Sequence, residues 1–271
     1  MCKPKLCIFK STIIPKMRGR NLKVRLLIGV AIALFFVFKR CSQQEVNPYT
    51  GRTQTISMNP NEEIAIGLQS APQMAQQHGG LHENAQYQAL VDNVGNKLVN
   101  SSIASETPYQ YEFHLLSDPN TINAFALPGG QIFITYALFA KLENEDQLAG
   151  VLGHEIGHVL GRHSAERIAE SEYWQGLTTA GSVGADMGGV ISGIGQNTLL
   201  TNGRDDELES DDLGVKFMIR AGYNPEEMIG VMQILKAAAG PNRVPEFQST
   251  HPDPDNRIEK IQESIQKYKS L

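Results

Sequence analysis

Residues 154–158 read His-Glu-Ile-Gly-His, a pair of histidines four positions apart with a glutamate after the first. Residues four apart on a helix are offset by only about 40°, so both imidazoles project from one face and can hold one metal ion. Glu155 lies beside the pair, where its carboxylate can act as a general base without ligating the metal. The pattern predicts a zinc site that includes His154 and His158.

The same pattern also arises by chance on surface helices, and two features of the surrounding sequence argue against that here. Residues 145–168 carry apolar side chains at helical spacing, which predicts a helix that is at least partly buried. A buried histidine pair needs a partner, and a metal ion supplies one. Four glycines of this segment lie along one stripe of the helix, which indicates that another backbone packs closely against it: Gly150, Gly153, Gly157 and Gly161.

A third protein ligand is required for a zinc site of this kind. One known arrangement continues as His-x-x-Gly-x-x-His, but the position of the last histidine is Ser164, and His163 is one residue early. His163 is therefore predicted to be a structural or surface histidine. The second arrangement takes a glutamate from a downstream helix.

The acidic segment 205–214 offers such a helix. Glu207, Asp211 and Gly214 fall on one face, which can present a carboxylate to the metal, a second carboxylate to orient a ligand histidine, and a glycine for close packing. Glu209 points about 160° away from Glu207 and is not expected to ligate. A solvated acidic face is the alternative, and spacing alone leaves both open.

The rest of the chain predicts an α+β, mostly helical domain that positions these residues. Periodicity and capping residues predict helices over residues 62–77, 85–101, 145–168, 205–221, 225–238 and 254–269, with Pro72 kinking or splitting the first. Strands are expected at 109–116, 123–127 and 131–135, the last two as a hairpin around Pro128-Gly129-Gly130. Residues 181–203 hold seven glycines and are expected to form a mobile loop or a loosely packed helix.

The N-terminus predicts a targeting or anchoring segment. Residues 1–40 contain ten basic and no acidic residues, and residues 26–38 are an uninterrupted apolar run. This run is short enough for a signal peptide, but no small-x-small cleavage site follows it, so we expect an uncleaved membrane anchor. Eight basic residues precede the run and two adjoin its end, which places the body on the non-cytoplasmic side. The expected organisation is this segment, a linker at 41–58 and one domain at 59–271.

The composition of the body excludes some classes of protein. Residues 41–271 carry 14 basic and 29 acidic side chains, so nucleic-acid binding is not expected. The three cysteines are Cys2, Cys7 and Cys41, so the domain at 59–271 uses neither disulfides nor cysteine ligands. Lipidation of Cys41 is a weaker interpretation than a membrane anchor, because Arg40 occupies the place where a small residue is usual.

Four segments together resemble the HtpX/CAAX-prenyl-protease type of gluzincin zinc metallopeptidases, especially its single-anchor or periplasmic BepA- and LoiP-like members. The segments are 123–139, 154–167, 204–214 and 251–257, and the resemblance covers roughly residues 55–270. It implies a zincin-type catalytic domain with a small antiparallel sheet, whose edge strand flanks the His-Glu-x-x-His helix.

The resemblance also implies roles for individual residues. His154, His158 and Glu207 would bind one Zn²⁺, Glu155 would be the general base, and Asp211 would orient a ligand histidine. Asn123 and Ala124 would pair with the backbone of the substrate. His251 and Arg257 would donate hydrogen bonds to the oxyanion of the tetrahedral intermediate, although packing under its loop explains His251 equally well.

These observations predict a zinc endopeptidase of the cell envelope that hydrolyses unfolded or misassembled polypeptides. It would be attached to the membrane through the N-terminal segment, or be secreted or periplasmic if that segment is cleaved. The alternatives are a zinc-stabilised chaperone or adaptor with little proteolysis, and a dedicated processing protease.

Overall fold

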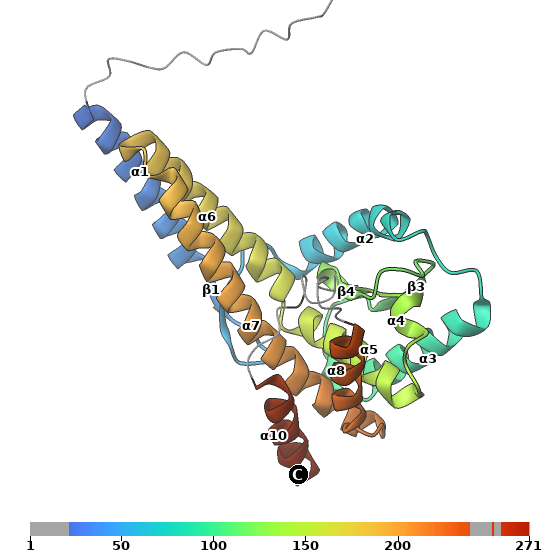
Figure 1. Ribbon diagram of the computed structural model, residues 1–271. Coiled ribbons are helices and arrows are strands. Elements are labelled where there is room, and N and C mark those ends of the chain that lie inside the picture. Colours follow the sequence, from blue (N-terminus) through green and yellow to red (C-terminus); the bar gives the residue numbers. More distant parts are fainter. Residues whose placement is uncertain (1–21, 239–250, 252–255, 271) are drawn as a thin grey trace, which may run out of the picture.

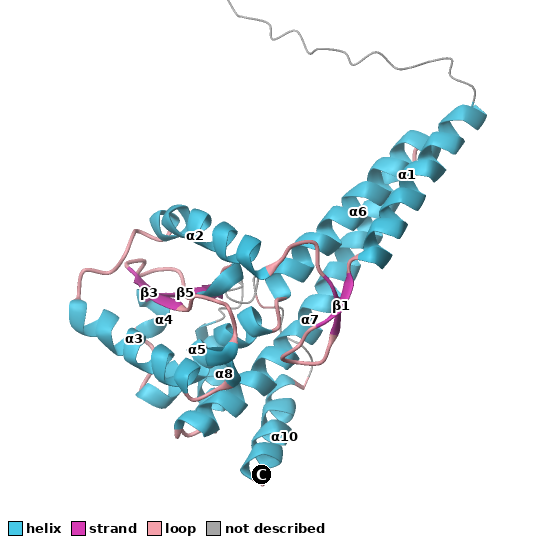
Figure 2. Ribbon diagram, turned by 180° about the vertical axis from the view of Figure 1, so that it is seen from behind, coloured by secondary structure: helices cyan, strands magenta, loops and turns pink. Residues whose placement is uncertain are grey.

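The computed structural model describes residues 22–238, 251 and 256–270, which form a body from which a three-helix arm projects (Figures 1 and 2). Helices predominate, and the strands form two small sheets. The α+β, mostly helical class predicted from the sequence is confirmed. The elements are α1 (Leu22–Ser42), β1 (Gln44–Val46), β2 (Thr53–Thr55), α2 (Pro60–Gln77), α3 (Ala85–Asn100), the 3₁₀ helix η1 (Ile103–Glu106), β3 (Glu112–Leu116), β4 (Ala124–Ala126), the 3₁₀ turn η2 (Pro128–Gly130), β5 (Gln131–Thr135), α4 (Tyr136–Phe139), α5 (Glu145–Leu160), α6 (His163–Ala185), α7 (Gly188–Ala221), α8 (Glu227–Ala238) and α10 (Arg257–Lys269).

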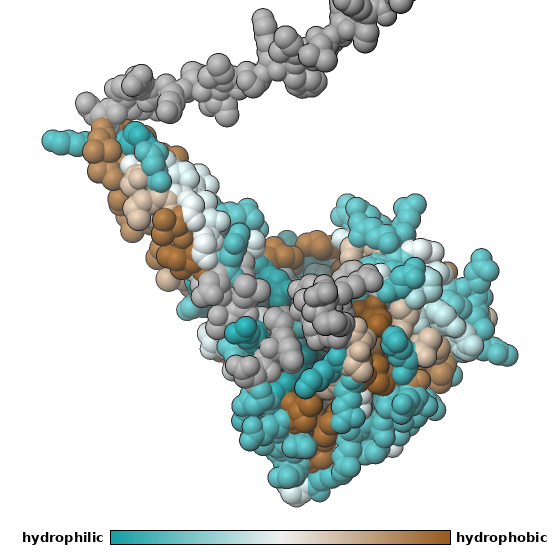
Figure 3. All heavy atoms as spheres, viewed as in Figure 1, coloured by the Kyte–Doolittle hydropathy of each residue, from teal (hydrophilic) through white to brown (hydrophobic). Residues whose placement is uncertain are grey.

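The arm consists of α1 and the hairpin formed by α6 and α7. Helix α1 contains the whole apolar run 26–38 and packs antiparallel to α6, with Gly29 against Gly184. The side of α1 turned away from α6 is apolar and exposed (Figure 3). None of the helices in the described part of the chain combines enough length with enough apolarity to cross a membrane. The basic residues before position 22 lie outside the described residues.

Residues 41–58, expected to be a linker, make a structured connection between arm and body. Strands β1 and β2 pair antiparallel, and two amides near the hairpin reach the end of α5. The side-chain amide of Asn47 donates to the carbonyl of Leu160 at 2.9 Å, and that of Gln54 donates to the carbonyl of Gly161 at 2.6 Å. These hydrogen bonds satisfy carbonyls that the end of a helix leaves unpaired.

The sheet of the body has the strand order β3-β5-β4. The predicted hairpin is confirmed: β4 pairs antiparallel with β5, and Gly129 and Gly130 make the turn at φ of 81° and 114°. The expectation of an antiparallel sheet is wrong for β3, which runs parallel to β5. The chain leaves β3, passes across to form β4 on the far side, and returns through the hairpin into the middle. Strand β4 is therefore the edge strand next to α5.

The two faces of this sheet are covered by different helices. Ile132 and Ile134 of the central strand face the main core, which α3, α5, α7 and α8 complete. Phe133 points the other way, into a smaller cluster closed by α2. A capping box at Asn59 and Glu62 starts α2, which continues through Pro72 as one helix, so the predicted split does not occur.

The predicted helix over 145–168 is interrupted. Helix α5 ends at Leu160, and Arg162 adopts a left-handed conformation at φ 57° before α6 begins. This uncommon backbone is stabilised because the Arg162 guanidinium is buried against Glu63, with nitrogen–oxygen distances of 2.6 and 2.9 Å. The apolar periodicity continues across the break, which is why the sequence pattern did not reveal it.

Helix α7 is much longer than the predicted segment 205–221. Residues 181–203 are helical except for the turn at Asp186 and Met187, so the loosely packed helix is the alternative that the structure supports. The predicted close approach to α5 is confirmed. A Cβ on Gly153 would lie 3.4 Å from the Cα of Gly214, and one on Gly157 would lie 2.9 Å from the Cα of Ser210.

Candidate metal centre

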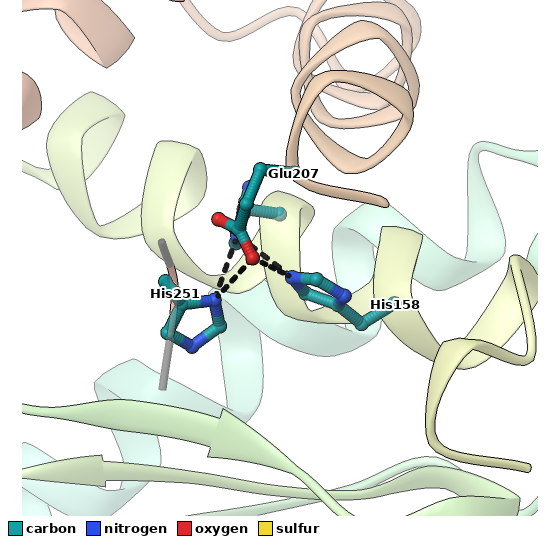
Figure 4. A group of neighbouring side chains, drawn as sticks. His158, Glu207 and His251 are labelled. Carbon is teal, nitrogen blue, oxygen red and sulfur yellow. Dashed lines mark hydrogen bonds and ion pairs between the residues drawn. The ribbon is translucent and has the colours of Figure 1, made fainter. Parts of the chain in front are cut away.

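Helices α5 and α7 bring two histidines and one glutamate to a common point (Figure 4). His154 and His158 lie one turn apart, and their Nε2 atoms are 3.0 Å from each other. Each Nε2 is 3.3 Å from a different carboxylate oxygen of Glu207. Together with His251, these residues offer ligand atoms that all lie within 4.8 Å of one another. The structure thus brings together the three residues that the sequence proposed as ligands.

The other nitrogen of each histidine is held from behind. His154 Nδ1 lies 2.8 Å from Asp211 Oδ1, the partner expected from the spacing on α7. His158 Nδ1 lies 2.9 Å from His163 Nδ1, and His163 Nε2 lies 2.8 Å from Glu209. Fixing one ring nitrogen orients the other toward the common point, as in known metal sites.

The sequence left open whether His163 is a structural or a surface histidine. It is buried rather than on the surface, and its ring lies behind a candidate ligand. The backbone break at Gly161 and Arg162 turns the start of α6 back toward His158, and a continuous helix would have carried His163 to another face. The glycine at 161 also leaves room for the imidazole, because a Cβ there would collide with it.

Burial and neighbouring charges set the protonation of the cluster. Burial lowers the pKa of His158 well below its usual value, so the imidazole is neutral, the form that binds metals. Burial alone would raise the pKa of Glu207, but the surrounding histidines outweigh it and keep the carboxylate ionised. For His154, burial is outweighed by hydrogen bonds to Asp211 and Glu207, which raise its pKa to about 10. A metal ion would take the place of that proton.

Glu155 has the environment expected of a general base. Its side chain is fully buried, and neither carboxylate oxygen has a hydrogen-bond partner among the described residues. Burial raises the pKa of Glu155, although the nearby His251 and His154 oppose this effect. A buried carboxylate without a hydrogen bond is costly unless a further group donates one, and a water molecule at the centre of the cluster fits that requirement.

The neutral and anionic donors fit a zinc ion. Two imidazoles and one carboxylate, each supported from behind, are the ligand set of one class of catalytic zinc sites. The unpartnered oxygens of Glu155 lie beside this set rather than within it.

Arg257, at the start of α10, binds the carboxylates behind the histidines. Its Nε donates to Asp211 Oδ2 at 2.6 Å, and its NH2 group lies 2.9 Å from Asp211 Oδ1 and 3.2 Å from Glu207 Oε2. Together with His154, it lowers the pKa of Asp211, for which burial alone would have the opposite effect. The expected role of Arg257 as an oxyanion donor stays a prediction.

His251 joins the cluster from the segment between α8 and α10, of which only His251 and Asn256 are described. Its Nδ1 is 3.0 Å from Glu207 Oε1, and its Nε2 is 3.6 Å from Glu155 Oε1. Nε2 also lies 3.2 Å from the carbonyl oxygen of Ala124 on the edge strand β4. His251 therefore touches a candidate ligand, the candidate base and the strand at once.

Asn123 and Ala124 lie at the start of β4, beside α5. Both are buried, and Asn123 is tied to the central strand through hydrogen bonds with Thr135. The carbonyl of Ala124 points to the cluster, where His251 occupies it. The strand that the sequence proposed for substrate pairing is thus an edge strand next to the metal centre.

A helix carrying His-Glu-x-x-His, a glutamate ligand from a second helix and an adjoining edge strand define a metallopeptidase of the gluzincin type. Comparison with family descriptions gives the same answer, since the one described as "Peptidase family M48" matches residues 85–265. The chain belongs to peptidase family M48.

Curated relatives carry the likeness beyond the family match. The chain is 30% identical to the "Beta-barrel assembly-enhancing protease" of Yersinia pestis over 229 residues, 79% of this chain and 46% of that protein. It is 34% identical to the "Mitochondrial metalloendopeptidase OMA1" of Schizosaccharomyces pombe over 165 residues, 60% of this chain and 49% of that protein. The "Beta-barrel assembly-enhancing protease" of Escherichia coli K12 is 31% identical over 182 residues, 62% and 37% of the two chains. The chain spans about half the length, or less, of these relatives.

Proposed function

We propose that this protein is a zinc-dependent endopeptidase in which Glu155 is the general base. The observation that carries the proposal is a complete candidate ligand set with a buried carboxylate directly beside it, which has no hydrogen-bond partner among the described residues. A site built only to bind metal for stability would have no use for that carboxylate, whose burial is unfavourable.

Each residue of the site would contribute one part of the reaction. His154, His158 and Glu207 would hold the ion, which when bound acidifies water and polarises a carbonyl. Glu155 would accept the proton of the attacking water and deliver it to the leaving amine. Asp211 and His163 would keep the two imidazoles aimed.

The substrate would bind as an extended strand along β4. An edge strand offers unpaired backbone N–H and C=O groups, which give affinity with little dependence on side chains. Ala124 provides a carbonyl that faces the cluster, and a substrate strand would compete for it with His251.

We propose unfolded or misassembled polypeptides of the cell envelope as the substrates. The printed names of the relatives describe a protease that enhances β-barrel assembly and a mitochondrial metalloendopeptidase, and recognition through a backbone edge suits chains without structure. A chaperone or adaptor with little proteolysis would not need the Glu155 carboxylate. A dedicated processing protease is the other alternative, and cleavage of casein by the purified protein would favour general proteolysis over it.

The protein would be attached to a membrane through its N-terminal segment, with the catalytic body on the non-cytoplasmic, periplasmic side. The eight-to-two distribution of basic residues around the run 26–38 supports this orientation. Cell fractionation combined with protease protection tests it, and a soluble cytoplasmic protein would contradict it. Cleavage of the segment would instead leave a secreted or periplasmic enzyme.

The substitution Glu155→Gln tests the enzymatic mechanism. We expect the variant to retain zinc and melting temperature and to lose casein hydrolysis, because every ligand remains and only the base is lost. Zinc content by elemental analysis and turnover are measured on the same sample. Near-normal turnover would refute the mechanism, whereas loss of zinc would show that Glu155 has a structural role.

A further inference from the structure

The arm presents an apolar surface that no described residue covers. On α1, large apolar side chains are exposed on the side facing away from α6, and Leu27 is 70% exposed. The tip of the α6–α7 hairpin continues this surface, since Met187 and Val190 are 51% and 60% exposed. Figure 3 shows apolar residues along the α1 side of the arm, whereas the surface of the body is mostly polar. An apolar surface of this extent marks an interaction site.

Charged pairs tie α1 to α6 at both ends of this surface. At the tip, the Arg25 guanidinium lies 2.9 Å from Asp186 and donates to the carbonyl of Val183 at 3.0 Å. At the base, Lys39 pairs with Glu172 at 2.7 Å, and Arg40 pairs with the buried carboxylate of Glu170. These pairs join the two helices as one unit, and Asp186 at the turn between α6 and α7 is paired with Arg25.

Between the charged pairs the helices pack through small residues. A Cβ on Gly29 would lie only 2.8 Å from the carbonyl oxygen of Ala180 and from the Cα of Gly184. Such close approach of small residues is typical of helices that associate in lipid, where apolar burial gives no driving force. The hydroxyl of Thr179 donates to the carbonyl of Gln175 one turn earlier, so this polar group is satisfied within α6.

Aromatic residues lie at the base of the arm. Tyr173 and Trp174 are neighbours on α6, and the Arg40 guanidinium stacks 4.6 Å above the Tyr173 ring. Aromatic and basic side chains at one level are typical of the boundary between lipid and water. From Trp174 to Asp186 the helix rises about 18 Å, and from Arg25 to Lys39 about 21 Å. The α6–α7 tip and α1 thus have apolar sections of similar length.

We propose that the tip of the α6–α7 hairpin enters the hydrocarbon region of a phospholipid bilayer beside α1, so that the arm inserts as a three-helix unit. No single helix of the described part is long and apolar enough, but the unit pairs its charges at both ends and exposes apolar side chains such as Leu27 and Val190. The section of about 20 Å is shorter than the hydrocarbon core of roughly 30 Å, a difference that long basic side chains and local thinning of the bilayer accommodate.

This inference rests on the proposed membrane attachment of α1, and depth-dependent quenching separates the two. In the full chain, Cys2, Cys7 and Cys41 are changed to serine, and one cysteine is placed at Leu27, Val190 or Leu81 for labelling with an environment-sensitive fluorophore. Leu81 lies on the body and is 59% exposed, which makes it the matched control. Each protein is reconstituted in phosphatidylcholine–phosphatidylglycerol vesicles with and without nitroxide-labelled acyl chains.

The expected result is a shift to shorter emission wavelength and a loss of emission by nitroxide at both Leu27 and Val190, with neither at Leu81. Trp174, the only tryptophan of the chain, reports on the base of the arm without a label and should be quenched by nitroxide near the headgroups. Quenching at Leu27 but not at Val190 would overturn the inference and leave the membrane attachment intact. Absence of quenching at both would overturn both. A Val190 label whose emission shifts without quenching by nitroxide would be covered by protein rather than lipid and would overturn the inference alone.

Discussion

The two candidate zinc histidines of α5 are supported by unlike partners. His154 is held by Asp211, whose carboxylate is fixed in turn by Arg257. His158 is held by His163, which is fixed by Glu209. Because the partners come from α6, α7 and α10, the aim of each imidazole depends on elements that are distant in sequence.

Glu207 and Glu209 are two positions apart on α7 but should differ in their effect on zinc. Glu207→Ala removes a candidate ligand, whereas Glu209→Ala removes a support for His163 and a partner of Arg52. We expect Glu209→Ala to weaken zinc binding by about 10- to 100-fold and Glu207→Ala to weaken it further. Titration with a competing chelator measures both affinities, with Glu259→Ala on the exposed side of α10 as control. Equal losses in both variants, or a loss confined to Glu209→Ala, would reverse the ligand assignment.

The position of His251 suits two different roles, that of an oxyanion donor and that of a fourth metal ligand. As an oxyanion donor it must move away from Ala124 when substrate binds, and as a fourth ligand it would keep the site closed. We expect His251→Ala to retain zinc through the three other ligands, to keep its melting temperature, and to lose turnover by roughly 100- to 1000-fold. Turnover and zinc content of the same sample decide the matter. Faster turnover would identify a closing ligand, and unchanged turnover would leave only a packing role.

Among the elements, the contact between α5 and α7 decides whether the ligands meet. The helices touch through backbone at Gly153 and Gly157, which brings the histidines of one within reach of Glu207 on the other. A wider contact would move the carboxylate away from both imidazoles. The glycines therefore act on the metal site through the distance between two helices.

Two glycines of α5 provide a matched test of this contact. A methyl group at Gly157 would meet the backbone of Ser210 at 2.9 Å, whereas one at Gly150 would meet Met228 at an ordinary 3.4 Å. We expect Gly157→Ala to lower the free energy of unfolding by roughly 1–3 kcal/mol and to lower zinc affinity as well. Gly150→Ala should be neutral or stabilising by up to about 1 kcal/mol, because alanine favours the helix. Urea unfolding with and without zinc checks this, and equal effects of the two substitutions would argue against the tight contact.

At the scale of the whole molecule, one helix connects the arm with the metal centre. Helix α7 runs from the tip of the arm past Glu207 to Ala221, and α6 runs from beside His158 back to the tip. Salt bridges of Arg52 from β1–β2 hold both helices near the site, at Glu166 on α6 and at Asp206 on α7. The position of the catalytic body relative to the arm is therefore set by the same helices that carry the ligands and their supports.

Removal of the metal should consequently lower the stability of the whole folded body. Zinc held by His154, His158 and Glu207 would join α5 to α7, and a ligand that binds only the folded state stabilises it by about 2.7–4.1 kcal/mol at 100 to 1000 times its dissociation constant. We expect chelation to lower the melting temperature by several degrees and added zinc to restore it. Glu207→Ala should show little response to either treatment. Identical melting of the wild-type protein with and without chelator would mean that the cluster does not bind zinc.

The sequence by itself determined the parts of the site that depend on local geometry. The period of a single helix places His154, Glu155 and His158 together, and that of another places Glu207 and Asp211 on one face, although spacing alone left open whether Glu207 is a ligand. The glycine stripe indicated a close helix contact, and Pro128-Gly129-Gly130 predicted the hairpin between β4 and β5. Each of these follows from a few consecutive residues.

Only the tertiary structure decided what depends on residues far apart in sequence. Strand β3 pairs with β5 in the parallel direction, although the sequences of the two strands also permit antiparallel pairing. The break at Arg162 exists because Glu63, about a hundred residues earlier, receives its guanidinium. That break turns His163 toward His158 and makes it part of the metal centre. The union of α1 with the α6–α7 hairpin likewise rests on pairs such as Arg25 with Asp186, whose charges find each other only after the chain has folded.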